Sequence, residues 1–385
     1  MSAGYTEPGR ASLLAVMSVI AIAGLGFGTS MPLLSILLER AGYSSTIIGL
    51  NTAVHSIAAL IVLPFAPRAL RRFGPARLLM TCLTVIALTL IIMRAFVDLW
   101  VWTPMRFIFG AALAMMFTTS EYWVNAIATE ATRGRLIGLY ATIFSLGWAT
   151  GPLLLGVLGV ESWTPVFVTT ALLGLSMIPL LAARHSAPVP EEAEPGGLLE
   201  VLREAPVAAS APFVYGAVEI GVFALLPVYA IQQGLSPGQG AAMLAALSAG
   251  NVALQYPIGW LADRVDRSRL LVFCALAGIV GAASLPFVIG NAPLLYATLF
   301  LWGGVVVGLY TLGLVLLGAQ FKGPRLVAAN TAVMILYSAG GLLAPPVSGA
   351  AMDLLPPHGL VLVLGLLCGT YAAYAALSLR KPQKA

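Results

Sequence analysis

The sequence is poor in charged residues and contains only three cysteines. Of its 385 residues, 9% are charged, whereas ordinary globular domains have about 25%. A water-soluble fold of this length needs more polar side chains to cover its core, so the composition excludes one. Cys82, Cys274 and Cys368 lie far apart within apolar runs and without CxxC spacing. We expect them to be small buried side chains and not metal ligands or redox partners.

Motifs of several enzyme and pump classes are also missing from the sequence. The chain has no GxxxxGK[ST] phosphate loop, no HExxH and no GxSxG, which argues against an ATP-driven pump and against a membrane hydrolase. Its three histidines are far from one another in the sequence, so no metal site is predicted. We expect no cofactor, and a proton gradient or the gradient of the substrate itself as the energy source.

Hydrophobic residues, which make up 59% of the chain, are gathered in long runs. Crossing a bilayer takes about 20 residues of helix, and the short alternating segments of membrane barrels are absent. The sequence therefore predicts an all-α membrane protein whose first helix is not cleaved. Twelve transmembrane helices are expected near 12–38, 45–67, 77–97, 100–127, 135–158, 163–183, 207–231, 240–262, 269–289, 293–319, 326–351 and 359–379.

The Lys and Arg residues indicate the orientation of these helices. Seventeen of the 20 lie in one set of alternate connections, and cytoplasmic loops are the ones enriched in basic residues. They are Arg10, Arg68, Arg71, Arg72, Arg77, Arg133, Arg135, Arg184, Arg203, Arg264, Arg267, Arg269, Lys322, Arg325, Arg380, Lys381 and Lys384. Both termini are thus predicted to be cytoplasmic, in a multi-pass protein of the bacterial inner membrane. The same placement accounts for the formal net charge of +5, so no nucleic-acid partner is expected.

The two halves of the chain repeat one another. Several matches fall at nearly one offset, 192 or 193 residues. They pair Gly42-Tyr43-Ser44 with Gly234-Leu235-Ser236, Gly110 with Gly303, Gly147 with Gly340 and Pro152 with Pro345. We predict a six-helix bundle over 1–183, a flexible cytoplasmic linker rich in Pro, Glu and Gly over 184–206, and a second six-helix bundle over 207–385. Two such bundles suit a transporter that exposes a midplane site to either side in turn.

Three motifs resemble those of the major facilitator superfamily. Residues 259–269 read GWLADRVDRSR, similar to the family's G-x-L-a-D-R-x-G-R-R loop. Asp263, Arg264 and Arg267 supply loop charges, whereas Asp266 stands where the family usually has Gly. The matching first-half stretch, PRALRRFGPAR, has Arg71 where the acid is expected, so we assign it no standard gating role. Arg106 to Gly110, RFIFG, is similar to the family's R-x-x-x-G motif. The resemblance covers essentially the whole chain and implies the twelve-helix major facilitator fold.

The fifth predicted helix carries the third motif. Its spacing, G-x8-G-x3-G-P, is similar to that of drug and proton antiporters within the family. The residues are Gly138, Gly147, Gly151, Pro152 and Gly156. Small residues allow close helix contact, and Pro permits a bend.

Glu219 is the strongest functional candidate within a predicted span. It lies about ten residues into the seventh helix, where a charged group costs about 2.5–3.5 kcal/mol on insertion scales. The resemblance implies that helices 1, 4, 7 and 10 line the central cavity. Glu219 is therefore expected to exchange a proton or to bind a cationic substrate; a structural pair with a neighbouring helix is the alternative.

Three further titratable residues lie within predicted spans. Arg106 is expected to transmit protonation, by the resemblance, or to pair with Glu219, bind an anion or extend to the outer headgroups. His55 is a proton-coupling candidate or a structural residue. Glu121 is expected to form an inner charge network with Arg133 or Arg135, or to serve proton chemistry in the cavity.

Polar and aromatic residues in several spans can line a substrate cavity, although each alone is also compatible with packing or lipid contact. They are Asn51, Tyr215, Phe223, Asn251, Gln255, Tyr310 and Tyr337. The helix 5 motif and Glu219 favour a secondary transporter that exports a small amphipathic or organic solute across the lipid bilayer against proton entry, and the resemblance implies that it works as a monomer. Proton-coupled uptake of a nutrient is the first alternative, and a membrane receptor or scaffold without transport is the second.

Overall fold

The computed structural model describes residues 7–128, 133–184, 198–321 and 324–379. Regular structure in these residues is helical, and twelve of the helices are long and apolar enough to cross a membrane. The predicted all-α class and the twelve predicted spans are confirmed.

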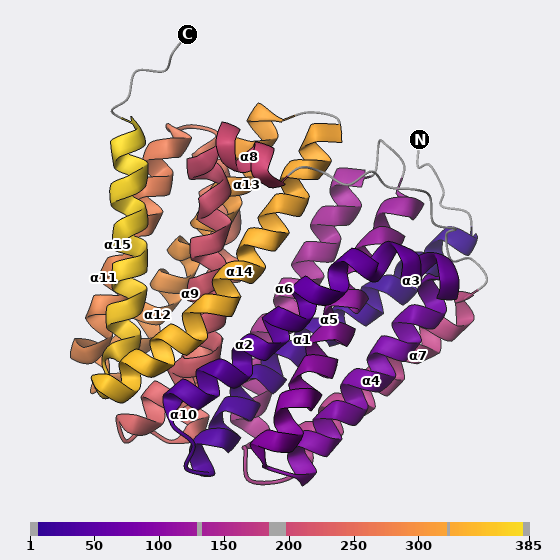
Figure 1. Ribbon diagram of the computed structural model, residues 1–385, viewed down its shortest axis with the longest axis horizontal. Coiled ribbons are helices and arrows are strands. Elements are labelled where there is room, and N and C mark those ends of the chain that lie inside the picture. Colours follow the sequence, from indigo (N-terminus) through magenta and orange to yellow (C-terminus); the bar gives the residue numbers. More distant parts are fainter. Residues whose placement is uncertain (1–6, 129–132, 185–197, 322–323, 380–385) are drawn as a thin grey trace. The chain divides into compact units, whose positions relative to one another are not determined.

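The chain forms two compact units, the first from Met1–Leu37 and Val54–Ala193, the second from Leu38–Ala53 and Glu194–Ala385. The first half of the chain contains α1 (Glu7–Arg40), α2 (Ser45–Val62), the short 3-10 helix η1 (Leu63–Phe65), α3 (Ala66–Phe73), α4 (Pro75–Ala95), α5 (Leu99–Ile127), α6 (Arg133–Leu158) and α7 (Thr164–Ala182) (Figure 1). The second half contains α8 (Leu198–Glu204), α9 (Pro206–Gln232), α10 (Pro237–Ala262), α11 (Arg267–Val288), α12 (Ala292–Val306), α13 (Gly308–Gln320), α14 (Pro324–Leu354) and α15 (Gly359–Leu379).

Polar side chains and prolines define where several of these helices begin. Asp98 accepts a hydrogen bond from the Trp100 backbone N–H at the start of α5, and Ser236 forms a reciprocal capping box with Gln239 at the start of α10. Such caps satisfy backbone N–H groups that have no partner within the helix. Pro occupies the first turn of α4, α9 and α10, where its missing N–H costs nothing.

The tip of the α1–α2 hairpin belongs to the second unit, although the sequence placed it within 1–183. The Asp353 carboxylate of α14 accepts hydrogen bonds from the backbone N–H groups of Ser45 and Thr46, each at 2.9 Å, and from the Thr46 hydroxyl at 2.6 Å. Gln232 of α9 donates to the Ser45 hydroxyl at 3.1 Å. Asp353 therefore caps the first turn of α2 from a segment more than 300 residues away in sequence, a contact that hydrophobic runs do not reveal.

Two helices differ from their predicted limits. The tenth span, expected as one helix over 293–319, is interrupted at Val307 between α12 and α13. The end of the predicted linker is not a flexible segment, because α8 is helical and Val201 and Ala205 are buried against α9, α13 and α14. Glu204 also pairs with Arg325 at 2.6 Å. The Pro, Glu and Gly content that predicted flexibility lies in residues 185–197, outside the described part.

The predicted repeat has matching contacts in the two units. Gly24 of α1 and Gly147 of α6 each lie against the backbone of the other helix, near Phe144 and Ala21 respectively. In the second unit, Gly216 of α9 lies against the backbone at Tyr337 of α14. Gly340 of α14 lies against the backbone at Phe213 of α9. A Cβ atom at any of these glycines would overlap the facing backbone, so glycine lets the helices approach closely.

Two more pairs of positions repeat in the same way. Gly110 of α5 lies against the backbone of His55 in α2, and Gly303 of α12 lies against the backbone of Leu247 in α10. Gly42 and Gly234, which follow α1 and α9, have φ values of 81° and 82°, a left-handed conformation that favours glycine. The internal repeat is thus a repeat of helix contacts and of turn geometry.

Candidate functional site

Glu219 lies at the centre of a polar cluster within the second unit. The Tyr215 hydroxyl, one turn earlier on α9, donates to one carboxylate oxygen at 2.7 Å. The Tyr337 hydroxyl of α14 donates to the other oxygen at 2.5 Å. The Asn251 side-chain amide of α10 donates to the Tyr215 hydroxyl at 2.7 Å. The close contact of α9 with α14 at Gly216 and Gly340 brings these groups within reach of one another.

Tyr310 of α13 completes the aromatic side of this cluster. Its ring centre lies 5.6 Å from that of Tyr215 and 6.1 Å from that of Tyr337. We call Tyr215, Glu219, Asn251, Tyr310 and Tyr337 the tyrosine–glutamate cluster. The break between α12 and α13 lies one turn before Tyr310.

Glu219 has hydrogen-bond donors around it but no cation. Within the described residues, the ion pairs of the second unit join Arg267 to Asp263 and Arg325 to Glu204, and none includes Glu219. A carboxylate removed from water without a counter-charge is costly, and phenol donors compensate only part of that cost. The arrangement therefore suits a group that binds a proton or a cation.

A small cavity adjoins the cluster. It has a volume of about 20 Å³ and is lined by Tyr215, Glu219 and Asn251 together with Trp302 and apolar side chains of α9, α10 and α12. This is room for about one water molecule. The indole N–H of Trp302, which belongs to a residue lining this cavity, is buried and has no hydrogen-bond partner among the described residues.

The structure brings four of the seven predicted cavity residues together around Glu219 and leaves three outside. Phe223 is 1% exposed and lies one turn beyond Glu219 on α9. Gln255 lies one turn after Asn251 on α10 and does not join the hydrogen-bond network of the tyrosine–glutamate cluster. Asn51 is 3% exposed on α2. Trp302 was missed, since a tryptophan in an apolar run resembles packing; its only signal is its position beside Gly303.

The first unit buries Arg106 and His55 in an aromatic environment. Arg106 is 1% exposed, so it does not extend to the headgroups, and its guanidinium lies 3.9 Å from the Met31 sulfur of α1. The His55 ring lies 5.4 Å from that of Phe27, which in turn lies 4.5 Å from that of Trp148. The His55 Nδ1 atom is buried and has no hydrogen-bond partner among the described residues.

The inner charge network expected around Glu121 stays a prediction, because its arginine side chains are not described. Glu121 is an exposed residue on α5, and its backbone oxygen accepts from the Asn125 amide at 3.0 Å. The side chains of Arg133 and Arg135 lie outside the described part. The neighbouring Ser120 hydroxyl shares a 2.9 Å hydrogen bond with Tyr140 of α6, so α5 and α6 are joined here by neutral groups.

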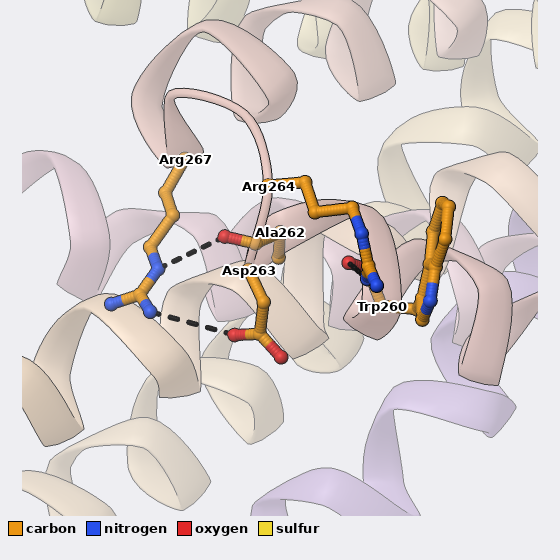
Figure 2. Close-up of polar contacts among 5 residues, drawn as sticks. All are labelled: Trp260, Ala262, Asp263, Arg264 and Arg267. Atoms are coloured by element: carbon orange, nitrogen blue, oxygen red, sulfur yellow. Dashed lines mark hydrogen bonds and ion pairs between the residues drawn. The ribbon is translucent and has the colours of Figure 1, made fainter.

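The loop between α10 and α11 is held by contacts among its own residues (Figure 2). Arg267 lies 3.6 Å from Asp263 and donates to the Ala262 carbonyl at 3.2 Å. The Arg264 guanidinium stacks on Trp260, 3.7 Å from the ring centre. Asp266, which replaces the usual Gly, caps α11 by accepting from the Arg269 backbone N–H at 2.7 Å.

The glycines of the helix 5 motif have unequal roles in α6. Gly147 and Gly151 lie against the α1 backbone, and the Thr29 hydroxyl of α1 donates to the Gly151 carbonyl at 3.2 Å. No atom of another element lies within 4 Å of a Cβ built at Gly138, and Gly156 is exposed. Pro152 lies inside α6. The middle of the motif therefore forms the α1–α6 contact.

Comparison with known proteins gives related sequences over nearly the whole chain. The sequence profile described as Major Facilitator Superfamily matches residues 16–308 and 209–385. The MFS-type transporter YfkF of Bacillus subtilis is 27% identical over 376 residues, covering 95% of this chain and 94% of that protein. The MFS-type transporter YE1530 of Yersinia enterocolitica is 28% identical over 290 residues, covering 75% of this chain and 74% of that protein.

Solved structures share the fold at low sequence identity. A mutant form of the nucleoside transporter NupG superposes with a TM-score of 0.79 at 13% identity and covers 95% of this chain and 98% of its own. A bacterial homologue of the human lysosomal transporter Spinster has a TM-score of 0.71 at 13% identity and covers 97% of this chain and 96% of its own. At such identity the likeness establishes the fold.

Proposed function

Because the chain belongs to the Major Facilitator Superfamily, we propose that it exports a small amphipathic or organic solute in exchange for protons. Membership makes the chain a multi-pass membrane transporter of a small molecule and not an enzyme, and such transporters need no cofactor. Direction, coupling ion and location in the inner membrane are parts of the proposal.

The observation that carries proton coupling is the Glu219 carboxyl, which is bound by two phenols and paired with no cation among the described residues. A carboxyl in this position is stable when neutral, and becomes charged when a cationic or polar substrate replaces the proton. Exchange of a proton for substrate on one group is the simplest basis of antiport.

The α6 motif supports export more weakly. Its similarity to drug and proton antiporters suggested the direction, and two of its glycines, Gly147 and Gly151, form the α1–α6 contact. Proton-coupled uptake would use the same fold and the same carboxyl, so the direction of coupled flux separates the two proposals.

The test is transport by purified protein in liposomes that contain a pH-sensitive dye. A panel of lipophilic cations, amphipathic drugs and metabolites is added under inward and outward proton gradients. Antiport predicts that a substrate entering the liposome drives protons out, whereas symport predicts that both move in the same direction. Solute movement in the same direction as protons would contradict export.

Matched variants locate the coupling group. Glu219→Gln removes the proton-exchanging group, whereas Glu204→Gln removes an exposed carboxylate that pairs with Arg325. We expect substrate-dependent proton flux to be lost in Glu219→Gln and kept in Glu204→Gln. Equal flux in wild type and Glu219→Gln would refute the assignment of Glu219.

A further inference from the structure

The short helix α3 is amphipathic and carries an unusual density of arginine. Ala66 and Leu70 are buried on one side of it. Phe65 and Phe73, which flank α3 and end it, are 53% and 52% exposed. Arg68, Arg71 and Arg72 are exposed on α3, and Arg77 is exposed in the first turn of α4. We call these four arginines the α3 basic patch.

Among the residues that the structure describes, no acidic side chain pairs with this patch. The sequence has no Asp or Glu between Glu39 and Asp98. Within the described residues, none of the four side chains forms an ion pair, and the Arg72 guanidinium lies 5.7 Å from the centre of the Phe73 ring.

The corresponding loop of the second half, between α10 and α11, contains acidic residues that the first-half loop does not have. There Asp263 pairs with Arg267, and Arg264 lies on Trp260 (Figure 2). Asp266 caps α11. In the first half Arg71 stands at the position of Asp263, so the substitution removes an acid and adds a cation at the same place. The repeat therefore leaves one loop internally paired and the other with an unbalanced positive charge.

We propose that the α3 basic patch is a binding surface for the headgroups of anionic phospholipids. A helix with arginines on one side and exposed aromatic residues beside them has the composition of an interfacial helix. The patch lies in the last residues of the candidate span Ser45–Phe73 and in the first turn of the next span, where lipid headgroups are within reach. Guanidinium groups bind phosphate with several N–H donors each.

The size of the effect follows from surface electrostatics. Each basic residue near an anionic membrane surface contributes roughly a fivefold change in affinity. Neutralising three arginines is therefore expected to weaken binding by about a hundredfold, and added salt is expected to weaken it further.

The test measures lipid binding directly. Purified protein in mild detergent is given equal amounts of phosphatidylglycerol and phosphatidylcholine, and the lipids retained are counted by native mass spectrometry. Wild type is expected to retain phosphatidylglycerol preferentially. R68Q/R71Q/R72Q is expected to lose that preference, whereas R68K/R71K/R72K keeps much of it because the charge remains.

Two controls keep the outcome specific. R264Q/R267Q/R269Q removes the same charge from the loop in which Arg264 and Arg267 already have partners, and it is expected to change lipid retention less. Inorganic phosphate at millimolar concentration should not displace the lipid.

Equal preference for phosphatidylglycerol in wild type and R68Q/R71Q/R72Q would overturn the proposal. Full displacement of the lipid by inorganic phosphate would also overturn it, because that result would indicate a site for soluble anions. The single variants R71Q and R71D provide the same comparison if the triple variant does not fold, with the larger loss expected for R71D.

Discussion

Tyr215 and Tyr337 hold the same carboxyl group but are not equivalent. The Tyr337 hydroxyl contacts only Glu219 within the tyrosine–glutamate cluster, whereas the Tyr215 hydroxyl also accepts from Asn251. Loss of Tyr215 therefore leaves two polar groups without a partner, and loss of Tyr337 leaves one.

We expect Tyr215→Phe to destabilise the protein more than Tyr337→Phe. Each stranded polar group costs about 1–3 kcal/mol, and the measurement is thermal unfolding of purified protein in detergent. Adding Asn251→Ala to Tyr215→Phe should cost little more, because the amide has already lost its partner. A larger effect of Tyr337→Phe would contradict the network described.

Glu219 could be predicted from the sequence because an acidic residue stands out within an otherwise apolar run. The other members of the cluster were predicted as candidates: Tyr215, Asn251, Tyr310 and Tyr337. Whether they converge depends on which side of each helix faces its neighbour, and an apolar run does not show how its helix is rotated about its axis. Trp302 carries no such signal: only its unpaired indole N–H beside the cavity distinguishes it from a packing residue among those the structure describes.

At the scale of elements, glycine positions account for the closest helix contacts. Gly147 and Gly340 occupy equivalent places in the repeat, and each faces the backbone of the first long helix of its half. Gly138, in the same helix as Gly147, has no atom of another element within 4 Å of an added Cβ. These positions form a matched set for substitution.

We expect Gly147→Ala and Gly340→Ala each to lower stability, since forcing atoms into a packed contact typically costs about 1–3 kcal/mol. Gly138→Ala should be neutral or stabilising, because Ala is favoured over Gly in a helix by about 1 kcal/mol. Size-exclusion profiles after graded heating compare the three. Equal behaviour of Gly147→Ala and Gly138→Ala would show that the α1–α6 contact is not tight.

Element boundaries were harder to predict than element identity. The twelve spans follow from length and hydropathy, but α8 was missed, because its few apolar residues are stabilised by burial against three other helices. The interruption at Val307 has no proline beside it, and the glycine that follows it, Gly308, is one of 40 in the chain and does not mark a break by itself.

For the whole molecule, the distribution of arginine and lysine fixes the predicted orientation. The connection between α6 and α7 is expected outside, and that between α10 and α11 inside. Ser162 and Val265 are exposed in these two connections, whereas the three native cysteines are buried.

We expect a cysteine introduced by Ser162→Cys to react with a membrane-impermeant maleimide in intact cells. One introduced by Val265→Cys should react only after the membrane is opened. Unsubstituted protein, with its buried thiols, serves as the background. Labelling of Val265→Cys in intact cells would reverse the predicted orientation.

The partition of the chain was the least predictable feature at this scale. The repeat and the linker suggested a division after residue 183, but Leu38–Ala53 packs with the second unit through Asp353, Ser45 and Gln232. Sequence proximity favours the first half. The capping interaction across more than 300 residues and the contact of Gly49 with the Pro345 backbone reveal the other association.

The central claim is that Glu219 exchanges a proton, and its protonation state can be measured without knowing the substrate. Infrared difference spectra of the reconstituted protein, recorded while the pH is raised, report the loss of neutral carboxyl groups. We expect the wild type to show a carboxylic C=O band that disappears on deprotonation and is absent from Glu219→Gln, while Glu204→Gln retains it. An identical carboxyl band in wild type and Glu219→Gln would mean that Glu219 does not change protonation, and would contradict its role in coupling.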